Sequence, residues 1–292
     1  SKSITNFYQK NSTYFFKGEN NLENLRKIIL KENYDYIPIL HKSMKIFKVV
    51  ELKDCEVSKI TNKKTSGVKN IPVIIMAGGL GTRLKPFTSI LPKPLIPINN
   101  KPIIRHIIES LSDSGIEKFW ISLNYKSVLL KSYFKEVELK EKIKFVEEKK
   151  PLGTIGAVKL IENKLAKDFF ITNCDTIIKT NYSDIYKFHK KNKFDLTIVA
   201  SLKKYVIPYG VCEINKNHAL DKLNEKPNYD LLVNTGLYMM RKNLIDLIPS
   251  NKKYDINHII TDLKKKNKKI GVYPISSDSW IDVGQWSEYK DA

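Results

Sequence analysis

Apolar residues in this chain form two patterns, short continuous runs and helical stripes, which alternate from residue 71 onward. The first run, 71–76, is rich in β-branched residues and predicts a buried strand. The same patterns predict strands at 118–124, 143–147, 168–172 and 194–200, and helices at 127–135, 154–162 and 184–192. This alternation predicts an α/β fold with a doubly wound, mostly parallel sheet that binds ligands at the carboxyl ends of its strands.

One more helix and three later strands are predicted. Pro102 is expected in the first turn of the helix, whose buried side carries Ile103, Ile104, Ile107, Ile108 and Leu111. Apolar patterning also predicts strands at 209–214, 219–224 and 231–240. We expect these three strands to lie over the mouth of the sheet and to carry further ligand-binding residues.

The first 57 residues have a different organisation. A helical stripe at 20–31 is followed by strand-like runs at 36–40 and 45–50. The order strand, helix, strand, turn, strand, short helix resembles a single CBS motif, a regulatory unit that normally works in pairs. Either a second copy lies upstream, or two chains supply one each, or the segment is a small α+β appendage without a ligand. The polar stretch 58–70 is predicted to be a linker.

Net charge is strongly positive, because 51 Lys and Arg outnumber 31 Asp and Glu to give +20. Such a charge ordinarily suggests nucleic acid as a partner. Only four of these residues are arginines, however, and the lysines are scattered, whereas grooves that read nucleic acid favour arginine. Nucleic acid is therefore not expected as a partner. The excess charge would still attract anionic nucleotides.

The three cysteines have no C-x-x-C spacing, which indicates neither a disulfide framework nor a zinc site. No apolar run approaches the roughly 18–20 residues of a membrane span, and no signal-peptide pattern opens the chain. We therefore expect a cytoplasmic protein without a membrane partner.

A glycine-rich stretch at 78–94 follows the first predicted strand and reads GGLGTRLKPFTSILPKP. A strand that runs into such a turn presents several backbone N–H groups in one concavity, which suits phosphate oxygens. Arg83 and Lys93 add positive charge. The spacing fits neither a dinucleotide fingerprint, since Leu84 replaces the third glycine, nor a Walker A loop. Nucleotide polyphosphate is the ligand that this loop predicts.

The pattern G-x-G-T-R-L-x-P-x-T followed by P-K-P, at 79–94, resembles the signature of the sugar-1-phosphate nucleotidyltransferases, which make nucleotide-sugars. Six further segments resemble motifs of this family in the same order along the chain: PLGTIGA at 151–157, FFITNCD at 169–175, YGVCE at 209–213, NEKP at 224–227, VNTG at 233–236 and WIDVG at 280–284. The resemblance implies that 71–292 is a nucleotidyltransferase domain with a Rossmann-like mixed sheet.

The resemblance also implies the reaction. A phosphate oxygen of a sugar-1-phosphate attacks the α-phosphorus of a nucleoside triphosphate in line, and pyrophosphate leaves. Both reactants are anions, so the protein must bring them together and neutralise developing charge, without a nucleophile of its own. Asp175 and Asp282 are implied to hold Mg²⁺, which prefers oxygen ligands. Cys174 stands where the family has a glycine, which puts the local backbone geometry in question.

Roles for the other residues are carried over by the same resemblance. Arg83 would contact the β- and γ-phosphates, and Lys93 would lie between the α-phosphate and the sugar phosphate. The base would rest near Ala77 and Gly78, with Glu148 or Asn124 at its edge. The remaining nucleotide contacts are expected from Gly79, Gly81, Thr82 and Gly153. Contacts to the sugar and its phosphate are expected from Gly210, Glu225, Lys226 and Asn234.

A CBS-like segment before such a domain favours the bacterial guanylyltransferases of surface-sugar pathways. GTP and glucosamine-1-phosphate, in legionaminic acid synthesis, are the substrates expected first. Mannose-1-phosphate guanylyl transfer, thymidylyl transfer and uridylyl transfer stay open as alternatives. A non-catalytic nucleotide sensor is the alternative of another class. A homo-oligomer is expected, with the CBS-like segment as one means of association.

Overall fold

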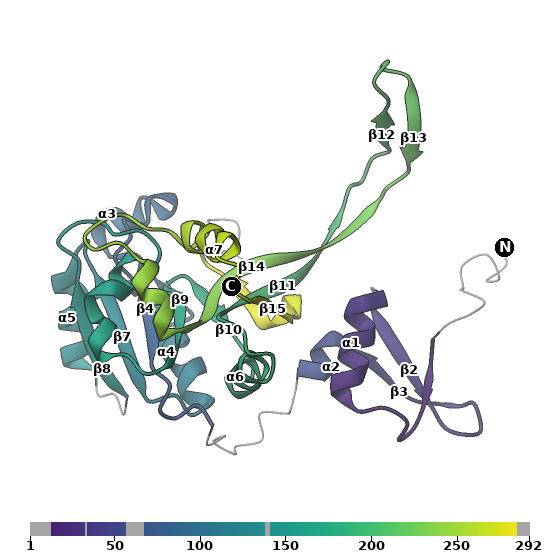
Figure 1. The fold of residues 1–292 in the computed structure, drawn as a ribbon, viewed down its shortest axis with the longest axis horizontal. Helices are drawn as coiled ribbons and strands as arrows, with labels where there is room; N and C mark the ends of the chain where they lie inside the picture. The colour runs from purple at the N-terminus through teal and green to yellow at the C-terminus, as the bar shows by residue number, and fades with distance from the viewer. Residues whose placement is uncertain (1–12, 33, 57–66, 138–140, 285–292) are drawn as a thin grey trace. The chain divides into compact units, whose positions relative to one another are not determined.

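The computed structural model describes residues 13–32, 34–56, 67–137 and 141–284. The chain divides into two compact units, Ser1–Thr61 and Asn62–Ala292 (Figure 1). Most of the predicted linker, at 58–66, lies outside the described residues, as do residues 1–12 and 57 of the predicted N-terminal segment and residues 285–292 of the predicted nucleotidyltransferase domain. None of the described helices is both long enough and apolar enough to cross a membrane.

The first unit is a three-stranded sheet with two helices. Its elements follow the predicted order: β1 (Phe15–Phe16), α1 (Leu22–Glu32), β2 (Tyr36–Leu40), β3 (Ile46–Glu51) and α2 (Leu52–Glu56). Strand β2 lies in the middle, parallel to β1 and antiparallel to β3. Leu25 and Ile29 of α1 are buried together with Ile37 and Val50 of the sheet, so the helical stripe seen in the sequence forms the core of this unit.

The second unit contains a seven-stranded sheet in the order β15-β11-β14-β9-β4-β7-β8. Six strands are parallel to one another, and only β14 runs against both of its neighbours. The predicted mostly parallel, mixed sheet is confirmed. Its strands are β4 (Val73–Met76), β7 (Lys118–Leu123), β8 (Lys142–Glu147), β9 (Asp168–Asn173), β11 (Leu196–Val206), β14 (Asn228–Arg241) and β15 (Ile270–Ile275).

Helices cover both faces of this sheet, which makes it doubly wound. Val73 and Ile75 of β4 pack on one side with α4 (Ile103–Asp113), α5 (Ser127–Glu136) and α6 (Tyr182–Lys191). Ile74 and Met76 pack on the other with η4 (Gly156–Lys164), η5 (Lys242–Leu247) and α7 (Ile256–Lys265). Because both faces are covered, every residue of β4 is buried, as its unbroken apolar run predicts. The five apolar residues predicted for α4 are all buried.

Shorter elements connect these layers. They are η2 (Thr82–Leu84), α3 (Phe87–Ile90), η3 (Lys93–Leu95), β5 (Pro97–Ile98), β6 (Lys101–Pro102), β10 (Thr176–Ile178), η6 (Ser277–Ser279) and β16 (Trp280–Asp282).

The three late strands do not lie where the sequence led us to expect them. The second half of β14 is a central strand of the sheet, because its Leu237–Met240 run is buried on both faces. Strands β12 (Val211–Ile214) and β13 (Leu220–Asn224) form a separate hairpin at the tip of an arm (Figure 1). We call residues 202–232 the arm: there β11 and β14 continue beyond the sheet and pair only with each other among the described strands.

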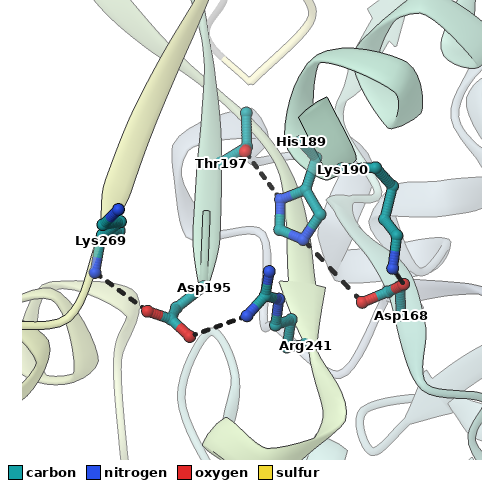
Figure 2. A network of polar contacts seen from close by, with 7 residues as sticks. All are labelled: Asp168, His189, Lys190, Asp195, Thr197, Arg241 and Lys269. Carbon is teal, nitrogen blue, oxygen red and sulfur yellow. Dashed lines mark hydrogen bonds and ion pairs between the residues drawn. The ribbon is translucent and has the colours of Figure 1, made fainter. Parts of the chain in front are cut away.

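A buried polar network joins helix α6 to the amino-terminal ends of strands β9 and β11 (Figure 2). The Nδ1 atom of His189 lies 2.8 Å from the hydroxyl of Thr197, and its Nε2 atom lies 3.9 Å from the Asp168 carboxylate. Lys190 forms an ion pair of 3.0 Å with the same carboxylate. Nearby, Asp195 accepts from the Lys269 backbone at 3.0 Å and pairs with Arg241 at 3.4 Å. These contacts bind four elements together.

Burial lowers the pKa of His189 to about 4, a shift that the Asp168 carboxylate partly opposes. The imidazole is fully buried, so the folded protein holds it in the neutral form at neutral pH.

Stability should therefore depend on pH through His189. An unfolded histidine has a pKa of about 6.5. At pH values between this pKa and the folded pKa, the unfolded chain therefore binds more protons than the folded protein does. Stability is fully present above pH about 6.5 and falls as the pH drops toward 4. Between pH 7 and 5 we expect a loss of about 2 kcal/mol that His189→Gln abolishes. Urea unfolding at the two pH values measures it.

His218→Gln is the matched control, because His218 is exposed on the arm. It should retain the wild-type pH dependence. An unchanged pH dependence in His189→Gln would refute the assignment.

Candidate active site

A cavity of about 320 Å³ opens where the neighbouring strands β9, β4, β7 and β8 end. Carboxyl ends of parallel strands meet at one edge of a sheet, which is where doubly wound folds bind ligands. The lining residues are Met76, Gly78, Gly79, Gly81, Lys93, Ser122, Glu148, Pro151, Leu152, Gly153, Thr154, Asn173, Cys174, Asp175 and Lys253. A larger hollow of about 650 Å³ lies at the other edge, near Lys167 and Arg241, and contains none of the predicted site residues.

The glycine-rich loop forms one wall of this cavity and folds back on itself. Gly81 has a φ of 65°, in the left-handed region that favours glycine. A Cβ atom there would lie 2.8 Å from Cγ2 of Thr88 and 3.1 Å from Cβ of Lys93. The Thr88 hydroxyl donates to the Gly81 carbonyl at 3.0 Å. The turn thus requires glycine at position 81 and brings Lys93 against the loop.

A buried carboxylate faces the start of the same loop. A Cβ atom on Gly78 would lie only 2.5 Å from Oε1 of Glu148. The other oxygen, Oε2, accepts from the Leu152 backbone N–H at 3.0 Å. Asn124 donates its side-chain amide to the Glu148 carbonyl at 2.7 Å, which fixes the backbone there. Burial raises the pKa of Glu148, while the hydrogen bonds from Leu152 and Ser122 oppose that shift.

The segment that begins at Pro151 is held by the residues just before helix α7. The backbone of Leu152 accepts from Tyr254 at 2.9 Å, and the Asp255 carboxylate accepts from the Thr154 N–H at 2.9 Å. Gly153, with φ 82°, has no room for a Cβ atom, which would lie 2.6 Å from the same carboxylate. Asp255 is also the N-cap of α7.

This arrangement places Lys253 at the cavity, which we did not predict from the sequence. The sequence feature that could have predicted this position is the N-cap of α7, formed by Asp255 and reinforced by His258. Such a cap fixes the position of the residues just before the helix.

Two carboxylates converge beside the cavity. Asp175 follows β9, and β10 then pairs with β16 so that Thr176 lies opposite Asp282. The Val283 N–H donates to the Asp175 carbonyl at 2.9 Å. A Cβ atom built on Gly284 would lie 2.9 Å from Oδ1 of Asp282 and 3.0 Å from Oδ2 of Asp175. The Gly284 N–H donates to Oδ1 of Asp282 at 2.8 Å, so one oxygen of each carboxylate lies beside this glycine, close to the Lys93 ammonium.

Lys93 completes this group. Its ammonium lies 2.5 Å from Oδ2 of Asp175, and its side chain is mostly buried. The neighbouring thiol of Cys174 is buried as well, and this burial, followed by the nearby Asp175 charge, raises its pKa to about 12. A buried thiol with a raised pKa is a poor nucleophile at neutral pH.

The remaining predicted phosphate-loop residues lie away from the cavity lining. Ala77 is buried beneath the loop, where its N–H donates to the Ser122 hydroxyl at 3.1 Å. Thr82 and Arg83 are exposed on η2.

The predicted sugar-side residues are also outside the cavity lining. Gly210, Glu225 and Lys226 lie on the arm, where a Cβ atom on Gly210 would be 2.9 Å from Oε2 of Glu225. Asn234, just past the arm, donates to the Tyr238 hydroxyl at 2.7 Å. The structure therefore brings together the loop, Glu148, Gly153, Lys93 and the two aspartates, and leaves the sugar-side set apart.

Residues 72–292 match the protein family described as Nucleotidyl transferase. The chain belongs to this family. The match covers three quarters of the chain and includes the loop, Lys93, Asp175 and Asp282, so the family resemblance found in the sequence is confirmed at the level of the family.

Curated relatives of this nucleotidyl transferase include two fungal enzymes. It is 34% identical over 225 residues to a mannose-1-phosphate guanyltransferase of Yarrowia lipolytica, with 74% of this chain and 61% of the relative covered. It is also 34% identical over 231 residues to the mannose-1-phosphate guanyltransferase of Saccharomyces cerevisiae, with 74% and 62% covered. The chain thus spans about three fifths of the length of these relatives.

Solved structures resemble this nucleotidyl transferase in fold. HddC from Yersinia pseudotuberculosis superposes with a TM-score of 0.61 at 29% identity, covering 76% of this chain and 97% of HddC. The same protein complexed with GMP-PN gives a TM-score of 0.60 at 28% identity, with the same coverage. A putative glucose-1-phosphate thymidylyltransferase from Bacillus anthracis, at 20% identity and a TM-score of 0.59 over 76% of this chain and 93% of that one, shows the shared fold alone.

A substitution in the loop tests the cavity. In Gly78→Ala the new Cβ atom must displace the Glu148 carboxylate. We expect Gly78→Ala to weaken nucleoside triphosphate binding about tenfold or more, equivalent to about 1.4 kcal/mol. Leu80→Ala is the matched control, because the Leu80 side chain is 53% exposed and lies outside the cavity lining, and it should bind like the wild type. Isothermal titration calorimetry measures both, and equal affinities would show that Glu148 and Gly78 do not border the nucleotide.

Proposed function

We propose that this chain transfers guanosine monophosphate from GTP to the phosphate of a sugar-1-phosphate and releases pyrophosphate. The observation that supports this most is the convergence of Asp175, Asp282 and Lys93 beside a cavity walled by the glycine-rich loop. A phosphate oxygen of the sugar forms a bond to the α-phosphorus of GTP, and the bond from that phosphorus to the pyrophosphate oxygen breaks.

Bringing two anions together is the main difficulty of this reaction. The Lys93 ammonium lies at the carboxylate pair and, in the proposal, contacts the α-phosphate as the sugar phosphate approaches. The N–H groups of the loop and the exposed Arg83 bind the β- and γ-phosphates. Fixed donors of this kind stabilise charge that develops in the transition state, because they need no reorganisation as the reaction proceeds.

A divalent metal ion fits the two aspartates. Family members generally use such an ion, and Mg²⁺ is the one that we propose here. Both candidate ligands are hard carboxylate oxygens, and one oxygen of each lies beside Gly284. No group of three acidic, histidine or cysteine side chains gathers in the described part of the chain. Two protein carboxylates suit Mg²⁺, which keeps several waters and binds substrate phosphates. When bound, the ion would neutralise phosphate charge.

Guanine is the base that we propose for this cavity. The Glu148 carboxylate is buried against Gly78, and carboxylate oxygens accept hydrogen bonds. Guanine offers the N–H donors of its N1 and exocyclic N2 atoms to such an acceptor. The fungal relatives are guanyltransferases by name, and HddC has been solved with GMP-PN, which supports the same base.

Two sugars are supported by different observations. Mannose-1-phosphate is supported by the names of the fungal relatives, and glucosamine-1-phosphate, for legionaminic acid synthesis, rests on the sequence resemblance alone. Gly210, Glu225, Lys226 and Asn234 remain the residues that we propose for the sugar and its phosphate. A CBS-like regulatory role for residues 1–57 is likewise a proposal.

A pyrophosphate-release assay tests the reaction. Four nucleoside triphosphates are each combined with mannose-, glucosamine- and glucose-1-phosphate, with Mg²⁺ or with EDTA. We expect GTP with mannose- or glucosamine-1-phosphate to give the fastest release and EDTA to abolish it. Release with another nucleotide would correct the base. Silence across the panel, while GTP still binds in calorimetry, would favour a nucleotide sensor over an enzyme.

Substitution of the two aspartates tests the metal site. Asp175→Asn and Asp282→Asn should each lower kcat/KM about 100-fold or more, which corresponds to about 2.7 kcal/mol of transition-state stabilisation. Thermal unfolding of both variants should stay cooperative and close to that of the wild type.

Asp278→Asn is the matched control, because Asp278 lies four residues before Asp282 and is exposed. It should keep wild-type kinetics. Near-normal activity of Asp175→Asn would rule out the carboxylate pair as the centre of the reaction.

A further inference from the structure

The arm is an unusual feature of this fold, because few contacts within the described part of the chain stabilise its two strands. Five residue pairs, from Leu202 with Leu232 to Val206 with Asn228, join its two strands, and the β12–β13 hairpin continues it. No third strand pairs with the arm in the described ranges. An isolated two-stranded ribbon is at best marginally stable in water. A partner surface would supply what is missing.

Apolar side chains on the arm are exposed to solvent. Nine large ones are at least 40% exposed: Tyr205, Val206, Tyr209, Ile214, Leu220, Leu223, Tyr229, Leu231 and Leu232. Clustered apolar exposure of this kind marks an interaction surface. The arm also has 31 residues. One side of a standard protein interface uses about 20–30 residues, so the arm is long enough to form one.

Charge distinguishes the arm from the rest of the chain. The arm contains five lysines and four acidic residues, which gives +1, so the rest of the chain carries +19 of the total of +20. Two copies would repel each other through most of their surfaces. The arm is the part that can approach another copy with little repulsion.

The arm also carries chemistry that its own cavity lacks. Glu225 and Lys226 are assigned to the sugar and its phosphate in the proposed function, yet neither lines the cavity. Lys226 is exposed, has a φ of 47°, and makes no ion pair with any described residue. Its N–H donates to the Tyr209 carbonyl at 3.2 Å, so the local turn is formed and presents the side chain outward.

We propose that two copies of the chain exchange arms, so that the arm of one copy lies across the mouth of the other copy's cavity. The contact covers the apolar side chains of the arm. It also supplies Glu225 and Lys226 to a sugar phosphate that is bound beside Asp175 of the other copy. A two-fold symmetric pair makes this contact twice and closes on itself. The catalytic part of this inference rests on the proposed function.

Complementation between two inactive variants tests the shared site. Asp175→Asn keeps the arm and loses the cavity, whereas Lys226→Ala keeps the cavity and loses the arm lysine. The two full-length chains are co-expressed with different tags and purified through both tags. Each variant alone should have on the order of 1% of wild-type activity. The mixed pair contains one intact site and should have about half of wild-type activity.

No recovery in the mixed pair would overturn the shared site, because an arm that serves its own cavity, or is covered by the first unit of its own chain, leaves both sites damaged. Failure to isolate a mixed pair would overturn it equally. An inactive wild type would instead count against the proposed function and leave the arm contact to the next measurement.

Association itself is measured without activity. The wild type should sediment as a dimer, and Ile214→Lys/Leu223→Lys, on the arm, should sediment as a monomer with its thermal transition retained. Val272→Lys is the control, because Val272 is similarly exposed but lies on β15, outside the arm. It should remain dimeric. A monomeric wild type, or a dimer that survives the arm substitutions, would overturn the arm exchange.

Discussion

The short pairing of β10 with β16 is the contact on which the candidate site depends. It sets Asp282 beside Asp175, although 106 residues separate them in the chain, and the Val283–Asp175 backbone hydrogen bond locks the register. Two carboxylates held this close repel each other unless positive charge lies between them. Lys93 supplies that charge from a third part of the chain. The loop, the sheet and the C-terminal strand thus meet at one electrostatic centre.

Stability and chemistry are divided between the two edges of the sheet. At the amino-terminal edge, the His189 network ties together α6, β9, β11 and β14 with buried polar contacts. At the carboxyl-terminal edge, backbone donors and charged groups remain available to a ligand. This division is typical of doubly wound sheets, in which the strand ends that carry the loops bind substrate. The same buried strands connect the two edges, so the site rests on a rigid frame.

The local patterns of the sequence were enough to predict most elements of the sheet, whereas the cluster at its mouth was predicted from the resemblance to the nucleotidyltransferase family. Buried strands such as β4 and the apolar side of α4 follow from side-chain periodicity, and motif order predicted that Asp175 and Asp282 act together. Long-range placement was harder. An unbroken apolar run shows that β14 is buried but does not show which strands flank it. Nothing in local spacing indicated that the sugar-side motifs lie on an arm, or that Lys253 reaches the cavity.

Asp255 gives the cavity wall an unusual dependence on a distant helix. The Asp255 carboxylate caps α7 and also accepts the N–H of Thr154. The same side chain therefore stabilises both the 151–155 segment of the cavity wall and the first turn of the helix. Fraying of the first turn of α7 would release the 151–155 segment at the same moment. Access to the cavity is in this way tied to the local opening free energy of a surface helix, and the amide protection of that helix would report on it.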